Sequence, residues 1–249
     1  MNMEIWKSTC SFLRPVDVIK LSIYNKDFKQ IVYEMIASEV EKFIPFDVTG
    51  QCFVSGRSVL EIIYNEKWSG DKFHICIPRN DVPPFLKTIT SNPSNKLVVG
   101  DAINGRMIVV INDKLCCIHM DYKTPEDAFR KSKIDIADLY FRKGKLFISN
   151  VFNVINKSTD VKFNYNNSIS VINRWSEIYD HSSEEERKVF STVDKTWPNP
   201  PRKIEELHFF RFGVEMEFEV LTEIIKLGIH FNDNRLENAK NHILFINSV

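Results

Sequence analysis

The spacing of apolar side chains along the first 43 residues predicts helices alone. Apolar residues recur at intervals of three and four from Phe28 to Phe43, which places them on one face of a helix over 25–43. Shorter stretches of helical character cover 4–13 and 16–23. Pro15 separates those two, because the residue before a proline avoids the helical region and proline suits the first turn of the next helix. The pattern therefore predicts a small helical module.

From residue 44 the pattern changes to short apolar runs alternating with helical periods. Strands are expected near 51–54, 72–77, 97–100, 107–111, 115–120, 134–141 and 145–148. Helices are expected near 59–66, 82–90, 125–131, 151–156 and 168–179. Thr124 is a good cap for the third of these helices, since Pro125 and Glu126 follow it. The alternation predicts an α/β or α+β domain with a mixed sheet, and we take α+β as the class.

The last third of the chain is more polar. The helices expected there include one over 215–227, with Gly228 past its end, and one over 236–245. The predicted division is thus 1–43 as a helical module, 44–180 as the α/β part and 181–249 as a helical extension.

Composition narrows the possible partners and the compartment. The 249 residues carry 33 basic and 33 acidic side chains, and this zero net charge disfavours bulk binding to nucleic acid or to anionic lipid. No apolar stretch approaches the roughly 20 residues of a membrane-spanning helix. The five cysteines are odd in number and lie mostly in apolar runs, which favours free thiols in a reducing, intracellular compartment.

The helical module carries a family resemblance. Its residues Ser11-Phe12-Leu13, Pro15, Asp17-Val18, Leu21-Ser22, Lys26, Phe28 and Ile31-Val32 resemble, in order and spacing, an F-box. That resemblance implies binding to the Skp-family adaptor of cullin ubiquitin ligases. The apolar anchors would be Leu13, Pro15, Val18, Ile19 and Leu21. The alternative is that these side chains only dock the helices onto the downstream domain.

A second resemblance covers roughly 46–179. Phe53 to Trp68 and the strand after it follow the order strand, glycine-serine turn, helix, tryptophan, strand. This order resembles the nucleotidyltransferase-fold proteins common in large DNA viruses, in which an F-box-like start often precedes the domain. The segments that carry the likeness are Asn65-Glu66-Lys67-Trp68, Ile134-Asp135-Ile136, Gly144 to Asn150, and Asn166-Asn167-Ser168-Ile169 with Arg174 and Tyr179.

The chemistry of that fold requires two carboxylates at i and i+2 on one strand and a third on a neighbouring strand, to hold Mg²⁺. Here Lys72 and His74 occupy the paired positions, and neither can replace a carboxylate around a hard cation. The resemblance therefore implies a domain that has lost its reaction. Alternatively, Asp71 rotates into place or another aspartate supplies ligands; the candidates are Asp101, Asp113 and Asp121.

The altered positions define a candidate phosphate or nucleotide pocket. Arg57 stands where the family has its second glycine, and Asp135 is the remaining candidate for the third carboxylate. Arginine and lysine both bind phosphate, so a cationic pocket could persist; otherwise these are ordinary surface or partner-contact charges. The proposed pocket residues are Gly56, Arg57, Ser58, Lys72, His74 and Asp135.

A cluster of cysteines and histidines near the same strands suggests a transition-metal site as another possibility. Cys116, Cys117 and His119, with His74 and Cys76, are metal-ligating residue types. Adjacent cysteines in a strand point to opposite faces, so Cys116 and Cys117 cannot both bind one metal. We therefore expect core thiols, no metal and no cofactor.

These observations favour a noncatalytic interaction or adaptor protein of a large DNA virus, in the host cytoplasm, the nucleus or the virion. Its expected partner is a protein, either a Skp-family adaptor or a viral assembly partner, with no membrane binding. The alternatives are a virion-associated structural protein and an active Mg-dependent nucleotidyltransferase.

Overall fold

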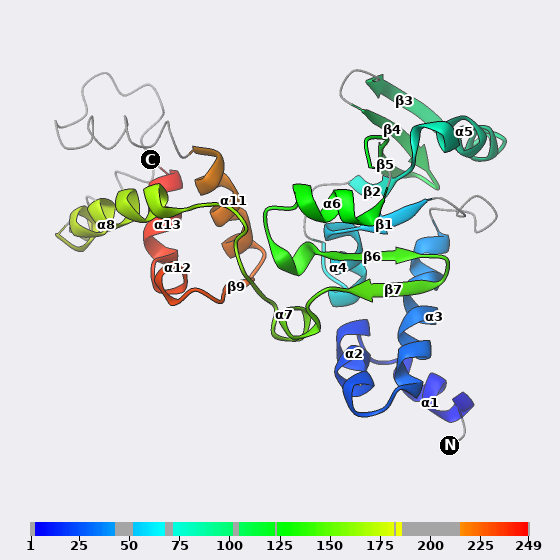
Figure 1. Ribbon diagram of the computed structural model, residues 1–249, viewed down its shortest axis with the longest axis horizontal. Coiled ribbons are helices and arrows are strands. Elements are labelled where there is room, and N and C mark those ends of the chain that lie inside the picture. The colour runs from blue at the N-terminus through cyan, green and yellow to red at the C-terminus, as the bar shows by residue number, and fades with distance from the viewer. Residues whose placement is uncertain are drawn as a thin grey trace. The chain divides into compact units, whose positions relative to one another are not determined.

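The computed structural model describes residues 3–42, 52–67, 72–101, 105–122, 124–181, 183–185 and 215–248. The chain forms two compact units, Met1–Asn156 and Lys157–Val249 (Figure 1). The division into 1–43, 44–180 and 181–249 stays a prediction, but the N-terminal helices and the sheet belong to one unit. The α+β class is confirmed.

Three helices open the first unit, as predicted: α1 (Met3–Cys10), α2 (Pro15–Tyr24) and α3 (Asp27–Glu41). Arg14 is extended before Pro15 begins α2, which is the conformation expected of a residue that precedes proline. Helices α2 and α3 pack on each other and on α4 (Arg57–Tyr64). Their shared core contains Val16, Val18, Ile19, Phe28, Ile31, Val32 and Ile36.

A seven-stranded mixed sheet follows, in the order β3-β4-β5-β2-β1-β6-β7. Its strands are β1 (Phe53–Ser55), β2 (Lys72–Cys76), β3 (Lys96–Asp101), β4 (Arg106–Ile111), β5 (Lys114–His119), β6 (Leu139–Arg142) and β7 (Lys145–Ile148). Neighbouring strands are antiparallel except β2 and β5, which are parallel. The order β1, turn, α4, β2 is the one that the nucleotidyltransferase-like resemblance predicted.

The two faces of the sheet differ. On β2, Phe73 and Ile75 are fully buried on the face that α4 covers, whereas His74 is half-buried on the other face. Helix α6 (Pro125–Lys131) contacts β1, and its Phe129 ring packs on Tyr140 of β6. Helices α4 and α6 therefore lie on opposite faces of the sheet (Figure 1), and His74 lies on the face with α6. The other helices of this unit are η2 (Arg79–Asp81), α5 (Val82–Thr90), η3 (Asp135–Ala137) and α7 (Val151–Asn156).

One predicted strand is shorter than expected. The sequence pattern predicts a single strand over 134–141, but 135–137 form the 3₁₀ turn η3 and the strand β6 begins at Leu139. Ile134 and Ile136 are both buried at this turn. The alternation of apolar residues, which predicts a strand, here reflects the burial of two side chains in a tight turn. The N–H of Asp138 closes the turn by donating to the carbonyl of Asp135 at 2.9 Å.

The second unit contains β8 (Ser158–Thr159), α8 (Asn166–His181), α11 (Glu215–Lys226), β9 (His230–Phe231), α12 (Asn234–Asn238) and α13 (Lys240–Ser248). The helix predicted over 236–245 is two helices, divided at Ala239. Strands β8 and β9 pair in parallel over two residues each, too few for a sequence pattern to reveal. Within the described ranges, no helix has the length and apolarity needed to cross a bilayer.

Candidate functional site

The site begins at the turn between β1 and α4. Gly56 has φ 60° and ψ −131°, a backbone conformation that residues other than glycine rarely adopt. Its N–H donates to the Leu139 carbonyl of β6 at 3.1 Å, which fixes the turn against the neighbouring strand. This geometry places Arg57 and Ser58 at the start of α4, beside β2.

Ser58 is buried at this position. Its hydroxyl accepts a 2.7 Å hydrogen bond from the backbone N–H of His74, and its side chain is 1% exposed. The serine of the glycine-serine turn therefore connects α4 to β2. A phosphate-binding role for it stays a prediction.

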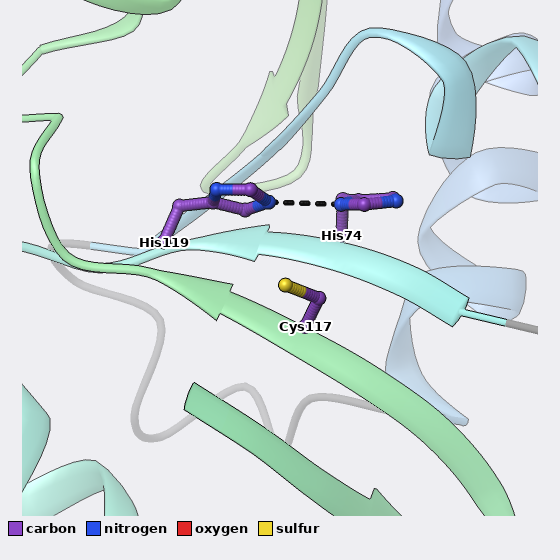
Figure 2. Close-up of side chains that lie close together, drawn as sticks. All are labelled: His74, Cys117 and His119. Atoms are coloured by element: carbon purple, nitrogen blue, oxygen red, sulfur yellow. Dashed lines mark hydrogen bonds between the residues drawn. The ribbon is translucent and has the colours of Figure 1, made fainter. Parts of the chain in front are cut away.

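The centre of the open face is a pair of histidines on the parallel strands. His74 of β2 pairs with Cys117 of β5, and Cys76 pairs with His119, so all four side chains share one face. The Nδ1 of His74 lies 2.8 Å from the Nε2 of His119, within hydrogen-bond distance. Figure 2 shows the two imidazoles and the Cys117 thiol on adjacent strands. The ligating atoms of His74, Cys117 and His119 all lie within 4.8 Å of one another.

The electrostatic environment keeps both imidazoles neutral. Burial lowers the pKa of His74, and the nearby cations Arg57, Arg106 and Lys72 lower it further. Burial also lowers the pKa of His119, to about 4, with further contributions from His74 and Arg106. At pH 7 one ring N–H therefore donates to the lone pair of the other ring. Burial raises the pKa of the Cys117 thiol.

Aromatic side chains continue this face. The Tyr122 ring lies 5.8 Å from His119, and the Lys131 ammonium lies 4.8 Å from the centre of the Tyr122 ring. Further along, Phe129, Tyr140 and Phe147 stack with ring centres 5.1–6.1 Å apart. Helix α6 supplies Phe129 and Lys131 and so positions one wall of the site.

The predicted pocket residues are only partly brought together. Gly56, Arg57, Ser58 and His74 meet at the β1–α4 turn, and Lys72 is exposed at the start of β2. Asp135 lies in η3 instead of on a strand, and its carboxylate accepts a 2.7 Å hydrogen bond from the Asn153 amide of α7. Its expected position on a strand beside β2 is wrong, because the chain turns before β6 begins.

The other aspartates are dispersed. Asp113 lies in the β4–β5 turn, at the end of β5 away from His119. Asp121 follows β5, and its carboxylate is 3.5 Å from the Arg79 guanidinium. Asp101 ends β3, paired with Arg106 of β4. Asp71 and Trp68 lie outside the described residues.

Sequence reasoning named Cys117, His119 and His74 among the candidate metal ligands, but it expected core thiols and no metal. Cys117 and His119 are two apart on one strand and therefore share a face, a signal that was present in the sequence. The prediction that Cys116 and Cys117 point to opposite faces is confirmed, since Cys116 pairs with Phe73 and Cys117 with His74. What could not be read was that β5 lies beside β2. All five cysteines are free and buried, as expected.

The N-terminal module divides its predicted anchors into two groups. Pro15, Val18 and Ile19 are buried within the first unit, with Val18 fully enclosed. Leu13 and Leu21 are exposed, at 38% and 36%. Pro15, Val18 and Ile19 therefore pack the helices onto the rest of the first unit, as the alternative to adaptor binding predicted. Leu13 and Leu21 are exposed to a partner.

Comparisons with solved structures gave distant matches, two of which are described here. No protein-family model matches the chain. No curated protein matches it. A structure titled "Thermotoga maritima CCA-adding enzyme complexed with tRNA_CCA" is similar over 85% of this chain and 53% of its own, with 13% identity and a TM-score of 0.46. A structure titled "The structure of CCA-adding enzyme apo form I" is similar over 83% and 52%, with 13% identity and a TM-score of 0.45. The chain spans about half the length of both.

Proposed function

We propose that this chain is a noncatalytic protein-interaction protein that binds a Skp-family adaptor through the surface around α2. The observation that carries the proposal is the set of exposed apolar side chains at both ends of this helix. Phe12 and Leu13 precede it, and Leu21 and Tyr24 lie in its last turns; Phe12 and Tyr24 are 89% and 88% exposed. These four residues are called the α2 surface below. Exposed apolar residues grouped on a short helix are typical of a protein-binding surface.

A groove beside α2 supports the same role. It has a volume of about 380 Å³ and lies between α2, α3, β7 and α7. Its wall includes the exposed apolar side chain of Ile23, and Lys26 and Lys29 lie beside it. A partner helix with apolar anchors and acidic flanks would fit this mixture of side chains.

The face that carries the histidines supports a noncatalytic role. Where the resembled fold needs a carboxylate pair, β2 presents Lys72 and His74, and His74 is engaged by His119. Cations and neutral imidazoles do not bind Mg²⁺. We propose on this ground that the domain is a scaffold, acting inside the host cell or the virion.

The test is co-purification of the full chain with a Skp-family adaptor. A Leu13→Glu/Leu21→Glu double variant is expected to lose binding by at least about tenfold, because two charges would enter an apolar contact. Leu97→Glu is the matched control, since Leu97 is 52% exposed on the edge strand β3, and it should bind like wild type. Failure of the wild-type chain to bind, or an equal loss in the control, would overturn the proposal.

Two further measurements separate the alternatives. Mg-dependent incorporation of any of the four labelled nucleotides, abolished by Asp71→Asn or Asp135→Asn, would establish an active transferase and refute the noncatalytic role. Self-association in sedimentation that Leu13→Glu/Leu21→Glu removes, without adaptor binding, would assign the α2 surface to assembly.

A further inference from the structure

We propose that His74, Cys117 and His119 form a binding site for a borderline-soft divalent transition metal of the Zn²⁺ class. The three side chains come from two adjacent parallel strands, and their ligating atoms lie within 4.8 Å of one another. Two imidazoles and one thiol are the donor set that Zn²⁺ prefers and Mg²⁺ does not. This inference is independent of the adaptor role, because it concerns a different face of the protein.

The distances between donors are close to those of a tetrahedral site. With Zn–N near 2.05 Å and Zn–S near 2.3 Å, two nitrogens stand roughly 3.3 Å apart and nitrogen and sulfur roughly 3.6 Å apart. The nitrogens of His74 and His119 are 2.8 Å apart, so they must separate by about 0.5 Å while the thiol approaches. Both movements are displacements of side chains, and the strand register already holds the three residues at neighbouring positions.

The arrangement of the two rings also suits a metal. Their nitrogens face each other at 2.8 Å, so each can present a lone pair once the ring that donates the shared proton adopts its other tautomer. The thiol must lose its proton, and a bound dication stabilises the thiolate. Binding is therefore M²⁺ plus thiol giving a metal thiolate plus one released proton, with no change of oxidation state.

The positive charges near the site determine which fourth ligand the metal would take. A dication with one thiolate leaves one positive charge beside Arg57, Arg106 and Lys72, whose charges already act on His74. This environment lowers metal affinity and favours water or an anion as the fourth ligand. Three protein ligands with an open fourth position is the arrangement found in zinc sites that bind small molecules.

The test uses the full chain, reduced and freed of metal by a chelator, titrated with Co²⁺ as a spectroscopic substitute for Zn²⁺. We expect a thiolate-to-cobalt charge-transfer band and tetrahedral ligand-field bands that saturate at one equivalent. Zn²⁺ should displace the cobalt, and Mg²⁺ should not. Absence of the bands in the wild-type chain, or displacement by Mg²⁺, would overturn the site.

The chain offers a matched control for the thiol. Cys117→Ser should abolish the charge-transfer band, whereas Cys116→Ser, which removes the adjacent buried thiol on the opposite face, should retain it. His119→Asn is a second variant, and it should weaken binding by more than the roughly 10–100-fold that loss of a partner outside the ligand set costs. His181→Asn, an exposed histidine of α8, should bind like wild type. Equal loss in Cys116→Ser and Cys117→Ser, with native circular dichroism in both, would contradict the assignment.

Discussion

At the scale of single residues, the site depends on side chains whose roles are structural as much as chemical. Ser58 is buried and accepts from the His74 N–H, and this hydrogen bond joins α4 to the strand that carries the histidine pair. Gly56 supplies the backbone conformation that allows α4 to begin there. Both were predicted as pocket residues, but sequence alone could not separate a hydroxyl that binds phosphate from one that accepts a buried N–H.

Ser58→Ala is expected to destabilise the first unit. The substitution leaves the N–H of His74 without its acceptor, and an unsatisfied buried donor costs about 1–3 kcal/mol. Urea unfolding of the full chain measures this loss. Ser55→Ala is the control, because Ser55 is only half-buried and makes a weak 3.6 Å contact to the Cys76 sulfur. An equal loss in both variants would refute the role given to Ser58.

The lowered pKa of Glu237, in the second unit, should make the free energy of unfolding depend on pH. Burial alone would raise the pKa of Glu237, but hydrogen bonds from His230, from Lys240 and from the Phe231 N–H outweigh it and lower the pKa to about 2. A carboxyl whose pKa falls on folding stabilises the protein above its ordinary pKa near 4.5, and this contribution is lost as the pH falls toward 2.

Glu237→Gln should therefore melt below wild type at pH 7, and the difference in melting temperature should narrow between about pH 4.5 and 2. Thermal unfolding followed by circular dichroism at a series of pH values gives both quantities. Glu219→Gln alters an exposed acid of α11 and should show little difference at any pH. A difference for Glu237→Gln that stays constant with pH would contradict the proposed cause.

At the scale of elements, local signals predicted most helices and strands, and long-range pairing was the missing information. Thr124, with Pro125 in the first turn, begins α6 as expected, because caps are encoded by adjacent residues. The two-residue strands β8 and β9 and the turn η3 were missed, since their conformation depends on segments distant in sequence. The same holds for the histidine pair, which requires β5 beside β2.

The N-terminal cap of α6 can be tested directly. The Asp127 carboxylate accepts a 3.1 Å hydrogen bond from the Thr124 N–H, so Asp127→Ala should cost about 0.5–1 kcal/mol. The free energy of unfolding measures this cost. Glu126→Ala removes a neighbouring acid and leaves that hydrogen bond in place, so its cost should be smaller. A larger loss in Glu126→Ala would mean that the charge of the first turn, and not the cap, stabilises α6.

At the scale of the whole molecule, zero net charge coexists with a local excess of positive charge. Arg57, Lys72 and Arg106 all act on the His74 side chain, whereas the chain as a whole carries equal numbers of acidic and basic residues. Composition correctly described the average but not this distribution, because charges from β2, β4 and α4 meet only in the folded sheet. The division into two units likewise follows contacts between elements, which no local composition change marks.

The parallel pairing of β2 with β5 also has a consequence for how the chain folds. His74 and His119 are 45 residues apart, and the strands that carry them form the one parallel pair of the seven-stranded sheet. Closing so long a loop costs conformational entropy before any contact compensates for it, so this pair is expected to form late. In a partly folded chain the two imidazoles and the thiol would be dispersed. The intact histidine pair is therefore a marker that the first unit has completed its folding.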